Sequence, residues 1–243
     1  MTELVAAEWL KLRTTRLLHG TVPAAVGLSV AAVAGMALAE PAPDLSSAEA
    51  VRRVLSVAGA GAVVVLVIGI LVSAGEYRHG TAGDTFLTTP RRRSVLAAKL
   101  TVAAMVGAAV GVLTGAACVV AAIALYRAES TTLPLADADV WLVLPATAAY
   151  TGLFAVLGVG LGAVIRNQVA AVAAALAWVA IVEHTLVNLV PSIGRWLPVG
   201  AGQAILRTPI DGLLSPPAGV VVLAAYAALA TVSAARLEEL RDV

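Results

Sequence analysis

Long apolar runs separated by short polar segments make up most of this 243-residue sequence. A helix needs roughly 20 apolar residues to cross the hydrocarbon core of a bilayer, and six of the runs reach or approach that length. These runs do not alternate between apolar and polar positions, as membrane-spanning strands do. The pattern therefore predicts an all-α integral membrane protein. Its six predicted transmembrane helices cover residues 17–39, 54–74, 100–126, 140–165, 168–190 and 218–235.

The composition agrees with lipid as the main solvent of this chain. Hydrophobic residues account for 60% of the sequence and charged residues for only 13%, whereas a soluble domain carries about 25% charged residues. The single cysteine, Cys118, lies within an apolar run, so the chain cannot form an internal disulfide. We expect residues 1–243 to form one transmembrane domain.

The distribution of charge predicts the orientation of the spans. Six spans place both termini on the same side of the membrane. The segments on that side hold 11 of the 16 lysine and arginine residues, and the opposite side holds five. Because basic residues near span ends favour the cytoplasm, both termini and the segment between the second and third spans are predicted to be cytoplasmic.

Small residues recur at four-residue spacing inside two of the spans. Gly107, Gly111 and Gly115 follow this spacing in the third span, and Gly158 and Gly162 follow it in the fourth. The spacing lets helix backbones approach closely, which stabilises helix pairs in lipid. It is compatible with packing inside this chain and with a subunit interface.

The first 16 residues, MTELVAAEWLKLRTTR, predict a helix that lies on the membrane surface. Val5, Trp9 and Leu12 fall on one helical face, with Glu8 and Lys11 nearer the other. The alternative is a plain cytoplasmic extension of the first span. The predicted anchors at the interface are Trp9, Lys11, Arg13 and Arg16.

A 25-residue polar segment, residues 75–99, separates the second and third spans. Connections of this length are usually functional or disordered. Apolar residues in its middle and a Thr-Pro step before the third span favour a short cytoplasmic helix. Its first part, EYRHGT, mixes charge with an aromatic ring, which suits a protein partner. Four basic residues near its end are interpreted as topology signals or contacts to anionic lipid: Arg91, Arg92, Arg93 and Lys99.

The segment before the last span, residues 191–217, is apolar but interrupted by five prolines and four glycines. It predicts a re-entrant pair or an interfacial helix on the outer side, with a partly ordered external loop as the alternative. Just before it, Glu183, His184 and Asn188 lie in the outer half of the fifth span. Ionisable groups inside a membrane commonly face a cavity or a partner. These three residues are candidates for a substrate pathway, and the alternatives are interfacial snorkelling and a hydrogen bond to a neighbouring helix.

The sequence offers little for catalysis. A P-loop requires G-x-x-x-x-G-K-S/T, and neither of the two lysines, in WLKLR and AAKLT, follows a glycine. The VEHTL stretch is not a zinc-protease H-E-x-x-H motif, and no G-x-S-x-G motif is present. We therefore expect a protein that is not an enzyme and binds neither metal nor cofactor. A membrane enzyme and a non-transporting anchor or regulatory subunit are the alternatives to a transport role.

The polar segment resembles the first cytoplasmic loop of ABC-2-type transporter permeases, particularly actinobacterial ones. Two other stretches are similar to the same family: AEWLKLRTTR at residues 7–16, and RWLPVGAGQAIL at residues 195–206. With the six spans, the resemblance covers essentially the whole chain. The residues that match the loop pattern are Glu76, Tyr77, Arg78, Gly80, Thr81, Leu87, Pro90, Arg91 and Lys99.

This resemblance implies a permease subunit of an exporter in the plasma membrane of a bacterium. Such permeases pair with a second permease subunit, as homodimer or heterodimer, and each rests on a cytoplasmic ABC ATPase that binds ATP and Mg. The family implies short re-entrant helices that cap the external exit. Membrane lipid is a further partner, and no nucleic acid is expected. The residues implied to contact the ATPase are Glu76, Tyr77, Arg78, His79, Gly80 and Thr81.

Overall fold

The computed structural model describes residues 2–39, 47–78 and 92–240, and these residues form helices and turns without any strand. Side chains are described throughout these ranges except at 92 and 238–240. The first half of the chain forms α1 (Thr2–Thr14), α2 (Leu17–Ala39), α3 (Ala48–Ser56), the 3₁₀ helix η2 (Val57–Gly61), α4 (Ala62–Arg78) and α6 (Arg92–Ala128). The second half forms α7 (Ala138–Ile165), α8 (Gln168–Ala177), the π-helix η3 (Trp178–Glu183), α9 (His184–Leu189), α10 (Pro191–Gly194), α11 (Pro198–Ile205) and α12 (Pro216–Leu240).

Six helical stretches are long and apolar enough to cross a membrane, which confirms the predicted fold class. The second is assembled from α3, η2 and α4, and the fifth from α8, η3 and α9. The second and third stretches, Ala48–Arg78 and Arg93–Ala128, are longer than the predicted spans at 54–74 and 100–126. Helix therefore occupies both ends of the predicted polar segment, and residues 79–91 lie outside the described part of the chain.

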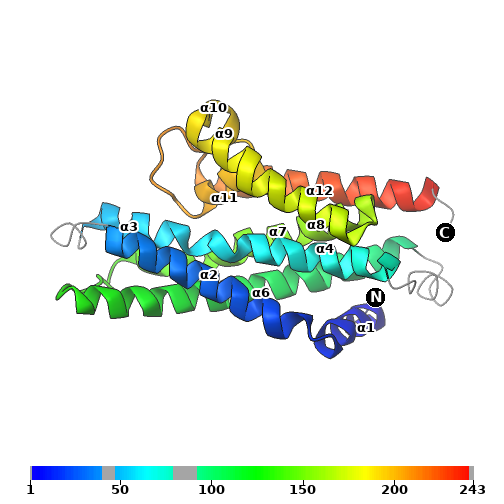
Figure 1. The fold of residues 1–243 in the computed structure, drawn as a ribbon, viewed down its shortest axis with the longest axis horizontal. Helices are drawn as coiled ribbons and strands as arrows, with labels where there is room; N and C mark the ends of the chain where they lie inside the picture. The colour runs from blue at the N-terminus through cyan, green and yellow to red at the C-terminus, as the bar shows by residue number, and fades with distance from the viewer. Residues whose placement is uncertain (1, 40–46, 79–91, 241–243) are drawn as a thin grey trace.

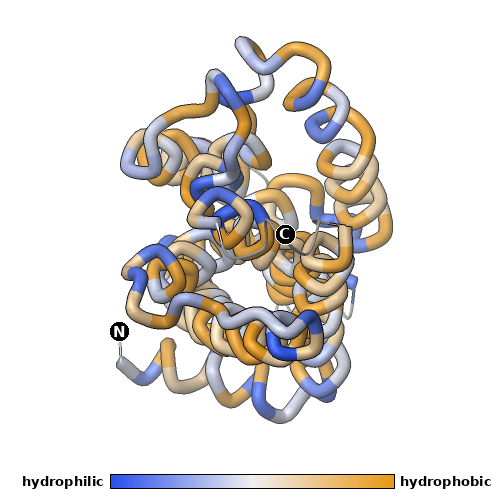
Figure 2. The backbone as a smooth tube through the Cα atoms, turned by 90° about the vertical axis from the view of Figure 1, so that its left-hand side faces the viewer, coloured by the Kyte–Doolittle hydropathy of each residue, from blue (hydrophilic) through white to orange (hydrophobic). Residues whose placement is uncertain are grey.

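The spans run side by side, and the helix α1 lies at the same end of the bundle as the last residues of α12 (Figure 1). We call this the terminal end; the opposite end, near α3, is the distal end. Helix α7 packs against α4, α6 and α12, so it lies at the centre of the bundle. Viewed from the distal end, polar segments gather in the connections while the helices are mostly apolar (Figure 2).

Exposed apolar residues cover the outer spans. Only 22% of the first span and 17% of the fifth are buried, compared with 67% of the second. Val169, Ile181 and Leu189 of the fifth span are each at least 66% exposed. Lipid contact explains this surface, because hydrocarbon solvates such side chains well.

The glycine repeat of the third span packs inside the chain. Thr147 and Thr151 of α7 donate hydrogen bonds to the carbonyl oxygens of Gly111 and Gly107, at 2.8 and 2.7 Å. The small residues let α6 and α7 approach closely enough for these bonds. Packing within the chain, one of the two predicted uses of the repeat, is confirmed.

Replacing Gly111 with alanine is expected to destabilise the protein by about 2 kcal/mol, because the new methyl group would collide with the α7 backbone at Thr147 and Ala148. Thermal unfolding of the purified protein in detergent measures the change. Gly35→Ala in α2 is the matched control, since nothing lies within 4 Å of its added Cβ. Equal stability of the two variants would contradict the close approach of α6 and α7.

The second span changes its helical geometry in the middle, at the sequence VAGAG of η2. Glycine has a low helix propensity, so this stretch can leave α-helical geometry at low cost. The amide of Gly61 donates to the Ser29 hydroxyl of α2 at 2.8 Å, which satisfies a backbone group in the buried interior. A 3₁₀ stretch within a helix often marks a hinge.

Candidate functional site: an ionic cluster at the terminal end

The N-terminal helix lies against the bundle with a face that differs from the predicted one. Glu8 and Leu12 are buried, whereas Trp9 is 48% exposed. The prediction that Glu8 lies nearer the opposite face from Leu12 is therefore wrong. The reason is electrostatic: the rim of the bundle presents charged groups to which Glu8 and Lys11 bind. Trp9, Arg13 and Arg16 stay exposed, which leaves them free for the predicted interfacial role.

Four charged side chains from three helices form one cluster, which we call the terminal cluster: Glu8 and Lys11 of α1, Glu76 of α4 and Lys99 of α6. Lys99 Nζ donates to Glu76 Oε1 at 2.5 Å and to Glu8 Oε2 at 3.2 Å. Lys11 Nζ donates to Glu8 Oε1 at 2.7 Å and to Glu76 Oε1 at 2.9 Å. Each lysine thus binds both carboxylates, and two positive charges balance two negative ones.

Because this cluster is buried, the loss of one of its charges affects stability more than the loss of a surface ion pair. The side chains of Lys99 and Glu8 are each only 7% exposed, and that of Glu76 is 14% exposed. Buried charges require partners, and removing one leaves the others uncompensated. Lys11 is 46% exposed. Partial burial lowers its pKa, but hydrogen bonds and charges from Glu8 and Glu76 outweigh this, so its pKa lies above the usual value. Lys11 is therefore protonated at neutral pH.

A cavity of about 490 Å³ adjoins the terminal cluster. Leu12, Leu17, Leu71 and Val72 supply apolar walls, and Glu76 is among the polar groups that line it. The cavity thus separates part of α1 from the ends of α2 and α4. Helix α1 is held to the bundle by the ion pairs of the cluster and by Leu12, which packs with Leu96 of α6, so its position depends partly on the cluster.

The last residues of α4 contact three different parts of the chain. Glu76 joins the terminal cluster. The Tyr77 ring lies 4.8 Å below the guanidinium of Arg166, which follows α7. Arg78 is exposed and donates to Gln168 of α8 at 3.4 Å. The end of α4 is therefore tied to α1, α6 and α8.

The predicted ATPase-contacting residues are thus only partly brought together. Of the three that the structure describes, Glu76 and Tyr77 bind other parts of this chain, and Arg78 is the exposed one. His79, Gly80 and Thr81 lie outside the described residues. Glu76 therefore holds the helix end in place and does not present its carboxylate at the surface.

The basic residues near the start of α6 differ in how exposed their side chains are. Lys99 is 6% exposed and bound to two glutamates, so the predicted lipid contact is wrong for this side chain. Arg93 is exposed. Arg91 and the side chain of Arg92 lie outside the described set. Sequence reasoning missed Glu8 as a site residue, although its position three residues after Val5 and four before Leu12 places it on the apolar stripe.

Glu183, His184 and Asn188 do not form one site. Glu183 is 1% exposed and accepts a hydrogen bond from the Val199 amide of α11 at 2.6 Å. His184 and Asn188 are exposed on the outside of the fifth span. Asn188 donates to the backbone oxygen of His184 at 2.7 Å. Glu183 therefore makes a hydrogen bond to a neighbouring helix, which was one of the predicted alternatives.

Metal ligation has no geometric support in the part of the chain that the structure describes, where no group of three or more His, Cys, Asp or Glu side chains converges. A comparison with curated proteins found no match. The family model described as ABC-2 family transporter protein matches residues 4–183. This range includes α1, the terminal cluster and the first five spans up to Glu183. The chain therefore belongs to the ABC-2 family of transporter proteins.

Proposed function

We propose that this protein is the permease subunit of an ATP-driven exporter and forms the transmembrane pathway for a hydrophobic or amphipathic substrate. Membership of the ABC-2 family makes it a multi-pass, non-catalytic membrane component of an ABC transporter, and such components generally work with an ABC ATPase subunit. The proposal adds the direction of transport and the substrate class of drug, lipid or peptide. The spans consist largely of Ala, Val, Leu and Gly, and this composition supports that class.

The proposed assembly contains a second permease subunit and separate ATPase subunits that bind ATP and Mg. The terminal end faces the cytoplasm in the plasma membrane of a bacterium, with α1 on the lipid surface. The excess of basic residues on this side supports the orientation.

The terminal cluster is the observation that carries the proposal. Residues 79–91 connect α4 to α6, and the cluster binds the ends of these two helices to each other and to α1 through Glu76 and Lys99. A force applied by an ATPase at the connection would therefore be transmitted to three helices together. In this scheme Arg78, with His79, Gly80 and Thr81, contacts the ATPase, and Glu76 and Tyr77 position that contact.

Replacing Arg78 with glutamate is expected to weaken binding of the ATPase by at least about tenfold, or 1.4 kcal/mol, because an interfacial positive charge is inverted. Membrane insertion should be unchanged, since the Arg78 side chain is exposed. The test coexpresses the permease with an ABC ATPase encoded beside it and measures copurification and ATP-dependent transport.

Arg13→Glu is the matched control, because Arg13 is also exposed on this end but lies on α1. If the wild type and both variants bound the ATPase equally well, we would conclude that Arg78 does not contact the ATPase. Copurification without transport of any substrate would favour an anchor or regulatory subunit, and activity of the chain without an ATPase would favour a membrane enzyme.

A further inference from the structure

A second cluster of charged side chains lies at the distal end of the bundle. Asp139, in the first turn of α7, accepts hydrogen bonds from Arg207 Nη1 at 2.9 Å and from Arg52 Nη1 at 3.4 Å. Arg52 belongs to α3, and Arg207 follows the end of α11. One carboxylate thus connects the second span, the fourth span and the short helix α11. We call these three residues the distal cluster.

Helix α11 is attached differently at its two ends. At its start, the buried Glu183 carboxylate binds the Val199 amide. At its end, Arg207 binds Asp139 through side chains that are 45% and 23% exposed. A hydrogen bond in the buried interior is strong because water does not compete with it, whereas an exposed ion pair is weak and screened by salt. Of these two polar contacts, the one at the end of α11 is therefore the weaker.

The backbone at Arg207 adopts a φ of 57°, a left-handed conformation that glycine adopts more easily than other residues. Its amide donates to the Ala204 oxygen at 3.1 Å and so closes the helix. Glycine would close the helix without strain at this position. Arginine adds the side chain that reaches Asp139.

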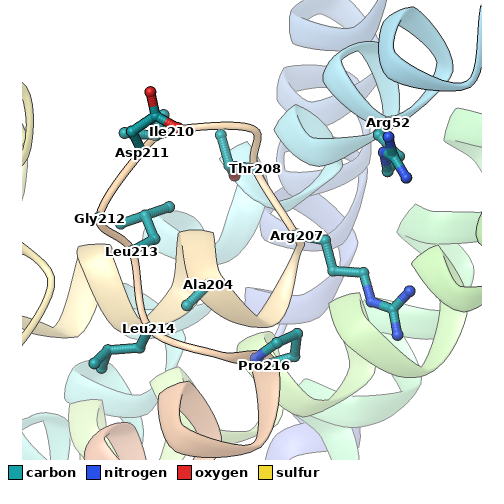
Figure 3. Close-up of a pocket in the computed structure, with 10 residues that line it drawn as sticks. All are labelled: Arg52, Ala204, Arg207, Thr208, Ile210, Asp211, Gly212, Leu213, Leu214 and Pro216. Atoms are coloured by element: carbon teal, nitrogen blue, oxygen red, sulfur yellow. The ribbon is translucent and has the colours of Figure 1, made fainter.

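Two cavities adjoin the distal cluster. A pocket of about 460 Å³ lies between α11 and the segment 207–216, with Arg52 and Arg207 on one side and Asp211 on the other (Figure 3). A second space of about 20 Å³ lies deeper, between α7 and the end of α11, where Val143 and Ala146 line it. Arg52 and Arg207 line both. Release of Arg207 would open the deeper space toward the larger pocket.

The second span connects the distal cluster with the terminal cluster. It carries Arg52 near its distal end and Glu76 near its terminal end, with the η2 break between them. At Gly59 of η2, an added Cβ would collide with Leu206, the residue next to Arg207. A movement of this span would therefore act on the end of α11 through both Arg52 and Leu206.

We propose that Arg52, Asp139 and Arg207 form a latch that closes the distal end of the transport pathway, and that α11 pivots about its Glu183 anchor when the latch opens. The role as a gate rests on the proposed transport function. The three residues act as positioning residues, because they hold α11 in place.

Cysteine labelling tests the latch without an ATPase or a substrate. In a Cys118→Ala background, Val143→Cys places a single thiol in the deeper space, and a membrane-impermeant maleimide is applied from the distal side. Val143 is 5% exposed, so labelling of the parent should be slow. Arg207→Gln should speed labelling about two- to fivefold, the factor by which loss of an exposed ion pair shifts a local opening equilibrium. Asp139→Asn, which removes both ion pairs, should speed it further.

Salt and a neighbouring arginine provide the controls. Added salt should speed labelling of the parent, because it screens the exposed pairs, and should have little effect on Asp139→Asn. Arg53→Gln should leave the rate unchanged, since Arg53 lines neither cavity and donates to Glu49 of its own helix at 2.8 Å. Ala146→Cys is a second reporter in the same space if Val143→Cys does not fold. Labelling that is independent of salt and equal in the parent, Arg207→Gln and Asp139→Asn would overturn the latch.

A second measurement separates the latch from the transport function. With the ATPase bound, trapping with ATP and vanadate should change the labelling rate of Val143→Cys in the parent. If the ATPase binds and transport proceeds while the labelling rate is the same in the parent and the latch variants, the latch is wrong and the transport function stands. If no ATPase binds but Arg207→Gln still speeds labelling, the latch stands and the transport function falls.

Discussion

Replacing Lys99 with alanine is expected to lower the free energy of unfolding by about 3 to 5 kcal/mol, because it leaves two buried carboxylates with too little positive charge. Lys99 binds Glu8 and Glu76. Among the side chains that the structure describes, the half-exposed Lys11 then remains bound to both. Unfolding of the purified protein in detergent, followed by heat or denaturant, measures the loss. The same change should loosen α1, which proteolysis of its first residues would report.

Arg13→Ala is the control, since Arg13 is exposed on α1 and should change stability by less than about 0.5 kcal/mol. The double variant Lys99→Ala with Glu76→Ala should lose less than the sum of the single changes, because each removes the other's partner. Strict additivity, or a Lys99→Ala protein as stable as the wild type, would show that the terminal cluster does not hold these helices together.

The architecture follows from the sequence because the membrane imposes one strong condition. Any spanning segment must satisfy its own backbone hydrogen bonds, so length and apolar content suffice to predict the six helices. The close helix packing at the glycine repeat of the third span could also be predicted, because Gly107 and Gly111 permit a close approach whichever helix faces them. Its partner, α7, could not be predicted from the spacing.

The terminal cluster was not predictable from local pattern. Lys99 stands at the end of a basic stretch, where a topology signal and a buried ion pair look the same in the sequence. Its partner Glu8 lies 91 residues away in the chain, and only the fold brings them to 3.2 Å. The position of Glu8 on an apolar stripe was the one available sign that a charge would be buried there.

The 3₁₀ helix η2 of the second span and the π-helix η3 of the fifth span could not be predicted from the local sequence either. The π-helix η3 turns Glu183 toward α11, where the amide of Val199 needs an acceptor. Leu197, at the position before α11, provides no side-chain cap, and Pro198 has no amide to bond. The need for Glu183 therefore arises from a helix that begins 15 residues later, which local sequence reasoning about an intramembrane carboxylate does not include.

Glu183→Ala is accordingly expected to destabilise the protein by about 3 kcal/mol, because it leaves the Val199 amide without its acceptor and opens a cavity beside α11. Unfolding in detergent measures the loss. Glu183→Gln should cost much less, since its side-chain oxygen can still accept from Val199. The exposed Asn188→Ala, on the same span, should change stability by less than about 0.5 kcal/mol.

The pair of Glu183 variants also separates a structural role from contact with substrate. A helix-anchoring carboxylate requires an acceptor but not a charge, so Glu183→Gln should transport at close to the wild-type rate while Glu183→Ala fails. A carboxylate that binds a cationic substrate requires the charge, so Glu183→Gln would then lose transport as fully as Glu183→Ala although its stability is preserved. That second outcome would return Glu183 to the substrate pathway. Because the stability of Glu183→Gln would be preserved, the anchor of α11 at the Val199 amide would stand beside that role.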